Sequence, residues 1–163
     1  MTLIESSFNY IYKYLVVISI ISKSNRNIHL LKNIFSAITY EDEFSKLFNA
    51  IYEDFNVENS LGLIEECARF MESDYFLCDY SELFVTKCKE VLIENHVDLN
   101  TLIDTNLFAR FFNEELDKIK TFIVNYIKSN HSDAEIHVND NVIKYKFKDT
   151  TKENQVNFYL KLL

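Results

Sequence analysis

The sequence lacks proline and tryptophan altogether and has a single glycine, Gly62, among its 163 residues. Winding loops and strand-rich sandwiches depend on glycine and proline for their turns. The scarcity of both residues therefore favours a predominantly helical fold. A phosphate-cradling loop also needs several glycines at fixed spacing, so neither G-x-G-x-x-G nor G-x-x-x-x-G-K-[ST] can be formed.

Cysteine is sparse as well. Cys67, Cys78 and Cys88 are the three in the chain, and no two of them have the C-x-x-C spacing. An odd number without that spacing disfavours a disulfide framework and a zinc site. Free cysteines in helical segments usually pack as small buried hydrophobes. This pattern fits a reducing compartment, and we expect a cytoplasmic protein.

Histidine offers no clear chemistry either. His131 and His137 lie on either side of the turn into a predicted hairpin, but no third ligand follows at a metal-binding spacing. Cys88 and His96 would lie two helical turns apart, which is too far for a nucleophile and its base. We therefore expect no catalytic residue, no metal site and no cofactor.

Long apolar runs are missing. The longest, at residues 15–21, has seven residues, whereas a membrane span needs roughly 18. A signal peptide is a second interpretation of this run, but no small-residue cleavage site follows it. We expect a helix that is buried on most sides.

Basic residues are scarce in the middle of the chain. The net charge is −8, and residues 41–80 hold eleven acids and two bases. Such a segment repels a phosphate backbone, which disfavours nucleic-acid binding by the whole chain.

What the sequence has in abundance is apolar residues at helical spacing. The hydrophobic content is 48%, with 14 Phe and 10 Tyr. The periodicity predicts helices over residues 4–22, 27–39, 41–55, 60–71 and 79–95. Because the connections are short, neighbouring helices should form antiparallel hairpins.

Residues 114–147 are the most informative stretch. Leu116, Ile119, Ile123 and Tyr126 recur at helical spacing and predict an amphipathic helix to about residue 129. We expect Ile123 and its neighbour Phe122 to be buried beneath a following hairpin.

The hairpin is indicated by a change of period. Past residue 133 the apolar residues alternate with polar ones, which predicts strands at 134–138 and 142–147 around the turn formers Asn139, Asp140 and Asn141. A helix followed by such a hairpin is the second half of a winged helix. Before it we expect a short helix near residues 99–104 and a loop over 106–113.

Two groups of motifs carry a family resemblance. The first is Phe122-Ile-Val-Asn-Tyr-Ile127, a five-residue polar spacer and Asp133-Ala-Glu-Ile136. The second, upstream, combines Ile51-Tyr-Glu-Asp-Phe55 with Glu66-Cys67 and Asp74-Tyr-Phe-Leu77. In their order along the chain, the two groups resemble the C-terminal region of PCI proteins. These are the helical scaffold subunits of the proteasome lid, the signalosome and eukaryotic translation initiation factor three. The resemblance is to the e subunits of that factor in particular.

The resemblance implies a mainly α fold of stacked helical hairpins followed by a winged helix. The implied parts are a helical-repeat region at 1–96, a winged helix at 97–148 and a tail helix at 149–163. The implied function is that of a non-catalytic scaffold subunit in a complex that recruits mRNA and initiator tRNA to the small ribosomal subunit, without membrane contact.

The resemblance also implies where partners bind. In the family, winged helices associate side by side through the hairpin edge, and tail helices join a bundle of several subunits. The predicted partner-binding residues are Val142, Lys144, Tyr145, Lys146, Phe147, Val156, Phe158, Tyr159, Leu160 and Leu163. Lysines at alternate positions of the second strand fit two roles, protection of a free strand edge or weak contact with RNA.

Three other interpretations stay open. The chain resembles PCI proteins in general, so a proteasome-lid or signalosome subunit is one alternative. A winged-helix regulator that binds nucleic acid is another, and salt-dependent binding to RNA or DNA would favour it. A small helical interaction protein is the third, and it would lack the hairpin.

Overall fold

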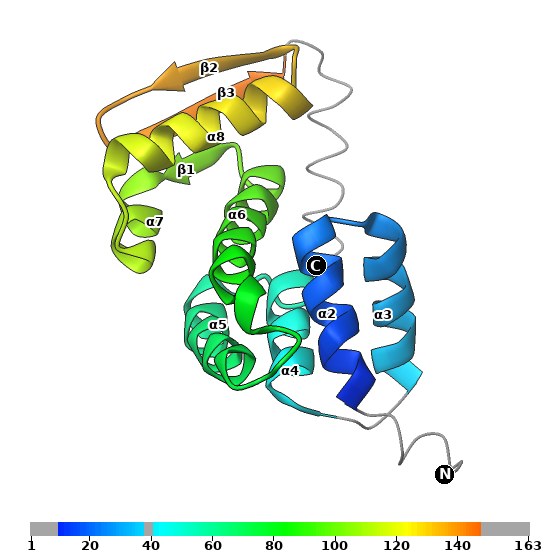
Figure 1. Ribbon diagram of the computed structural model, residues 1–163. Coiled ribbons are helices and arrows are strands. Elements are labelled where there is room, and N and C mark those ends of the chain that lie inside the picture. Colours follow the sequence, from blue (N-terminus) through cyan, green and yellow to red (C-terminus); the bar gives the residue numbers. More distant parts are fainter. Residues whose placement is uncertain (1–9, 38–40, 148–163) are drawn as a thin grey trace. The chain divides into compact units, whose positions relative to one another are not determined.

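The computed structural model describes residues 10–37 and 41–147. The chain forms two compact units that divide between Val91 and Leu92, inside the helix α6 (Ser81–Leu99) (Figure 1). The predicted fold class is confirmed: the chain is mainly helical, with one small antiparallel sheet in the second unit. The predicted tail helix lies outside the described residues.

The first unit is a layer of antiparallel helices. The helices are α2 (Tyr10–Ser22), α3 (Asn25–Ala37), α4 (Glu43–Tyr52), α5 (Val57–Glu72), the short 3-10 helix η1 (Cys78–Tyr80) and the beginning of α6. Helix α2 packs against α3 and α4, and α4 packs against α5. The predicted helices are present, with ends that differ by a few residues from those expected.

Polar caps explain where two of these helices begin. Asp42 accepts a hydrogen bond from the Ser45 backbone N–H at 2.7 Å, and the Ser45 hydroxyl accepts one from the Asp42 backbone N–H at 2.8 Å. This capping box satisfies two helix donors at once. At the start of α5, the Asn56 side chain accepts from the Asn59 backbone N–H at 2.9 Å, the usual role of an N-cap asparagine.

The core of the first unit is filled by large apolar side chains. Its fully buried members include Val16, Ile20, Leu31, Leu47, Phe48, Ile51, Ile64, Met71 and Phe84. The apolar run at 15–21 is largely internal, although Ile18 is 53% exposed. None of the helices in the described ranges is long and apolar enough to cross a membrane.

A carboxylate clamp holds the connection between α5 and η1. Asp74 accepts hydrogen bonds from the Lys13 ammonium at 2.6 Å, the Tyr14 hydroxyl at 2.9 Å and the Phe76 backbone N–H at 3.0 Å. The Lys13 hydrogen bond is the largest cause that lowers the pKa of Asp74, and the same bond raises the pKa of Lys13. The clamp joins the end of α5 to α2.

The second unit is a winged helix. After α6 come β1 (Leu102–Asp104), α7 (Thr105–Phe112), α8 (Leu116–Asn130), β2 (Ala134–Val138) and β3 (Val142–Phe147). The predicted hairpin at 134–138 and 142–147 is confirmed with the same bounds. All pairings are antiparallel, and the strand order is β1-β3-β2. Helix α8 contacts β2 and α7, and it lies along the sheet (Figure 1).

Two expectations upstream of α8 are wrong. The short helix expected near 99–104 is absent, because α6 ends at Leu99 and residues 102–104 form β1. The loop expected over 106–113 is mostly the helix α7, which buries Phe108 and Phe112 at helical spacing. Helix α7 begins after Asp104, whose side chain accepts from the Asn106 backbone N–H at 2.9 Å.

The apolar face of α8 forms the core of the winged helix. Ile119, Ile123 and Ile127 follow one another at four-residue spacing and are 4%, 0% and 0% exposed. This burial confirms the expectation for Ile123. Phe122 is only half-buried, because it lies one residue, or about 100°, around the helix from the buried stripe.

The burial of Ile123 makes it a direct test of this core. We expect Ile123→Ala to lower the free energy of unfolding by about 2–5 kcal/mol, because it removes buried methyl groups and leaves a cavity. Urea denaturation measures the loss. Thr121→Ala, at an exposed position of the same helix, is the matched control and should change stability little. Equal effects at both positions would show that Ile123 is not a core residue.

The Asp74 clamp predicts a pH-dependent stability difference. A lowered pKa in the folded state means that ionised Asp74 stabilises the fold above the ordinary aspartate pKa of about 3.9, and that this contribution is lost as the pH falls through the lower folded-state pKa. Asp74→Asn should therefore melt below the wild type at pH 7, and the difference should shrink below pH 3.9. Asp54→Asn, on an exposed residue, is the control. A difference that persists unchanged into acid contradicts the clamp.

Candidate partner-binding surface

The free edges of the sheet differ from the edge that the sequence predicted. Strand β3 is central: Ile143 pairs with Ile103 of β1 on one side and with Val138 of β2 on the other. The expectation that residues 142–147 form an exposed strand edge is therefore wrong for Val142 to Lys144, which β1 covers. Within the described residues, β1 and β2 are the outer strands.

The edge of β2 offers unpaired backbone groups. The Asn139 backbone N–H donates to the Val142 carbonyl at 2.9 Å, which fixes the residues of β2 that face β3. Backbone groups alternate in direction along a strand, so Ile136 and Val138 direct theirs away from β3, where no described strand lies. Val138 is 51% exposed. An open edge of this kind is a template for strand addition by a partner.

The outer face of the sheet carries balanced charge. Leu102, Lys144 and His137 lie in one row across the three strands, and Glu135 lies opposite Lys146 in the next. Among the described residues, the acids on this face, Asp104 and Glu135, equal the two lysines in number. The face is therefore not the basic strip that nucleic-acid backbones usually require.

Tyr145 belongs to the core. It is 0% exposed, and its hydroxyl donates to the Val97 carbonyl of α6 at 2.6 Å. Burial, and then the nearby charge of Asp98, raise the pKa of Tyr145 to about 12. Its place among the predicted partner-binding residues is wrong, because its side chain is enclosed by its own unit.

The other predicted partner-binding residues fall into two groups. Lys144 and Lys146 are exposed and Val142 is half-buried, so all three have side-chain surface on the outer face. The Phe147 side chain and the residues Val156, Phe158, Tyr159, Leu160 and Leu163 lie outside the described parts of the chain. For these residues the partner role stays a prediction.

A polar network that the sequence analysis missed fixes the end of α8. The Tyr126 hydroxyl donates to Asp98 at 2.9 Å, and His131 Nε2 lies 3.3 Å from the other Asp98 oxygen. The His131 ring stacks on Tyr145 with an interplanar angle of 14°. Burial is the main cause that raises the pKa of Tyr126, and Asp98 adds to it. His131 therefore links α8 to Asp98 of α6 and to Tyr145 of β3. Separately, the described residues hold no cluster suited to a metal ion.

The chain is similar in sequence to E subunits of eukaryotic translation initiation factor 3. The chain is 27% identical over 138 residues to that protein of Bombyx mori, and 25% identical over the same length to that of Culex quinquefasciatus. Each of these two alignments covers 82% of this chain. The Yarrowia lipolytica protein is 20% identical over 104 residues, which are 64% of the chain. The chain is similar to these E subunits. The predicted resemblance is confirmed.

The similarity concerns part of the relatives. The alignments cover 31% of the Bombyx and Culex proteins and 25% of the Yarrowia protein, so the chain spans about a third of their length or less. No family model matches the chain. The resemblance therefore rests on individual relatives that are longer than this chain.

The Tyr145 hydrogen bond can be tested separately from the ring. Tyr145→Phe keeps the buried ring and leaves the Val97 carbonyl with only the longer bond from the Asn100 backbone N–H at 3.4 Å, which should lower the free energy of unfolding by roughly 0.5–1.5 kcal/mol. Chemical denaturation measures the change. Tyr75→Phe, on a side chain that is 87% exposed, is the control and should have no effect. A Tyr145→Phe protein as stable as the wild type would show that the bond is dispensable.

Proposed function

We propose that the chain acts as a non-catalytic scaffold component of the translation initiation factor 3 complex. The observation that carries the proposal is the similarity to the E subunits of that factor, which extends over 82% of the chain and so includes residues of both units. Through the complex, the chain would serve the recruitment of mRNA and initiator tRNA to the small ribosomal subunit in the cytoplasm.

The proposed contact with a neighbouring subunit is strand addition to β2. The Ile136 and Val138 backbone groups face away from β3, and the neighbouring Val138 side chain is half-exposed. A strand from another winged helix would extend the sheet at this edge and bring two winged helices side by side. Lys144, Lys146 and Val142 would form the adjoining outer face.

The tail helix is proposed to join a bundle formed with other subunits. Val156, Tyr159, Leu160 and Leu163 recur at helical spacing in the sequence, and a helix of about fourteen residues is only marginally stable by itself. Support for this role comes from the family resemblance and from the apolar spacing.

The balanced charge of the outer face favours a protein partner over RNA. A phosphate backbone is attracted by an excess of basic residues, and the described residues of this face include equal numbers of acids and lysines. Any RNA contact by Lys144 and Lys146 would accordingly be weak. We therefore attribute RNA binding to the assembled complex and not to this sheet face alone.

Affinity purification from the native source tests the assignment. With the tagged chain as bait, we expect the other subunits of initiation factor 3 to co-purify, together with small-subunit ribosomal proteins at low salt. Recovery of proteasome-lid or signalosome subunits would overturn the assignment in favour of another PCI complex. Recovery of nucleic acid without other subunits would support the winged-helix regulator.

The strand-addition contact predicts a specific effect of proline at the edge. Val138→Pro removes an N–H that points away from β3, so it should abolish the partner contact while the sheet keeps its own hydrogen bonds. Val138→Ala keeps the N–H and is the matched control. We expect partner subunits to co-purify with Val138→Ala and to be lost with Val138→Pro.

Two further measurements keep this test decisive. Circular dichroism shows whether the proline variant is folded. Val138→Lys is a second variant, because a charge on an edge strand opposes strand addition without changing the backbone. Retention of all partners by both variants would exclude the β2 edge as the contact.

A further inference from the structure

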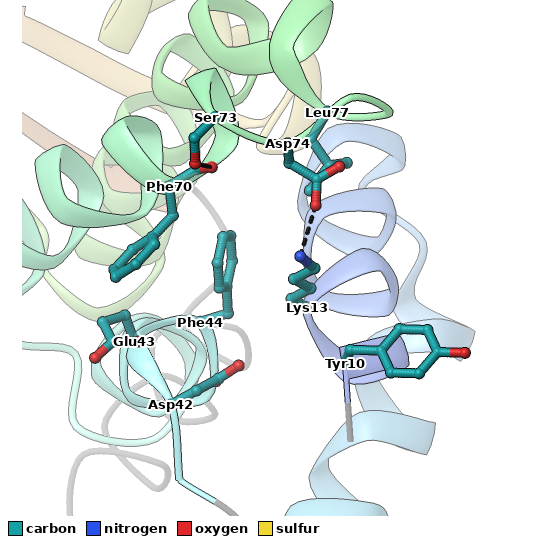
Figure 2. A pocket seen from close by; sticks show the side chains of 9 residues that line it. All are labelled: Tyr10, Lys13, Asp42, Glu43, Phe44, Phe70, Ser73, Asp74 and Leu77. Atoms are coloured by element: carbon teal, nitrogen blue, oxygen red, sulfur yellow. Dashed lines mark hydrogen bonds and ion pairs between the residues drawn. The ribbon is translucent and has the colours of Figure 1, made fainter. Parts of the chain in front are cut away.

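The helical unit contains a groove that the sheet-edge contact does not use. The groove has a volume of about 410 Å³ and is bounded by the start of α2, the start of α4 and the end of α5. Figure 2 shows Phe70 and Phe44 with Glu43 on one side of it, and the Lys13–Asp74 ion pair across from them. Phe70 is 49% exposed, so an aromatic ring is available to a ligand at this wall.

The groove combines aromatic and carboxylate side chains. Asp42, Glu43 and Asp74 contribute three acids to its lining, and Lys13 is the one base there. Lys13 is already paired with Asp74 at 2.6 Å. Glu43 has no ion pair with any base among the described residues, and it lines the same groove as Phe70 (Figure 2). Because Asp42 caps the start of α4 and Asp74 is paired with Lys13, Glu43 is the carboxylate of this lining that a ligand can reach, in the same groove as the exposed Phe70 ring.

The chain itself shows how such a lining holds a cation. The Lys13 ammonium lies 4.9 Å from the centroid of the Tyr14 ring and 2.6 Å from Asp74. A cation in such a position is stabilised twice, by the cation–π interaction with the ring and by the charge-assisted hydrogen bond with the carboxylate. Phe70 and Glu43 contribute the same two kinds of group to the lining of the groove.

We propose that this groove docks an arginine-bearing segment of a protein partner. The guanidinium would stack on Phe70 and pair with Glu43, since the planar guanidinium is suited to both contacts at once. The surrounding charge fits a basic peptide and opposes a nucleic acid, because residues 41–80 hold eleven acids and two bases. The surface is separate from the β2 edge, so this inference does not depend on the proposed function.

The test uses the full chain and a fluorescein-labelled peptide of alternating arginine and leucine. Fluorescence anisotropy measures the affinity, and a second peptide with lysine in place of arginine measures the contribution of the guanidinium. Any acidic protein attracts such a peptide, so the variants are chosen in matched pairs. Glu43→Gln is compared with Glu65→Gln on an exposed position of α5, and Phe70→Ala with Tyr75→Ala on an exposed ring outside the groove.

We expect Glu43→Gln and Phe70→Ala each to weaken binding roughly fivefold or more, the change that corresponds to about 1 kcal/mol, and the two control variants to weaken it clearly less. The lysine peptide should bind more weakly than the arginine peptide. Phe70→Ala separates docking in the groove from general attraction to an acidic protein, because it leaves the net charge unchanged.

Three results would overturn the proposal. The first is equal loss of affinity in the groove variants and their controls, which would mean general attraction to an acidic protein. The second is binding of a single-stranded RNA oligonucleotide that the groove variants abolish. The third is concentration-dependent self-association that Phe70→Ala abolishes, which would make a second copy of the chain the occupant. Thermal melts confirm that each variant is folded.

Discussion

One buried hydrogen bond joins the central strand of the winged helix to the helix that precedes the sheet. Tyr145 lies in β3, the strand that pairs on both sides, and its hydroxyl donates to the Val97 carbonyl near the end of α6. The last carbonyls of a helix have no partner within the helix. The Val97 carbonyl has one weak donor nearby, the Asn100 backbone N–H at 3.4 Å, so the 2.6 Å bond from the buried tyrosine is its main hydrogen bond and joins sheet to helix. The His131 ring stacked on Tyr145 extends this contact to the end of α8.

The chain forms its turns almost without glycine, and this has a local cost. Lys23, Phe55 and Asn113 adopt positive φ of 49–51°. Asparagine tolerates this conformation better than other non-glycine residues, which suits Asn113 at the C-terminal end of α7. Phe55 is a bulky residue in the same left-handed conformation, which strains its backbone. Such strain persists only where the surrounding structure holds the residue in place. The scarcity of glycine predicted a helical fold correctly, but it gave no indication of these three positions.

The elements that the sequence predicted well are those with several periods of pattern. The hairpin has two alternating strands of five and six residues around three turn formers, and its bounds agree with the structure. Strand β1 has three residues, too few for an alternation to be recognised. It forms because β3 offers it an unpaired side, which is a tertiary effect. The helix α7 was predictable in principle, since Phe108 and Phe112 have helical spacing, but its eight residues gave a weak signal.

The partner surface was less predictable than the fold, for a related reason. Alternation alone placed Tyr145 on the apolar side of β3 and Lys144 and Lys146 on the other, so the pattern itself argued against Tyr145 as a contact residue. The free edge could not be found in this way, because it depends on which strand β1 joins. Once β1 occupies one side of β3, the remaining long edge among the described strands belongs to β2, and for this reason the proposed contact surface is the edge at Ile136 and Val138 instead of the lysine strand.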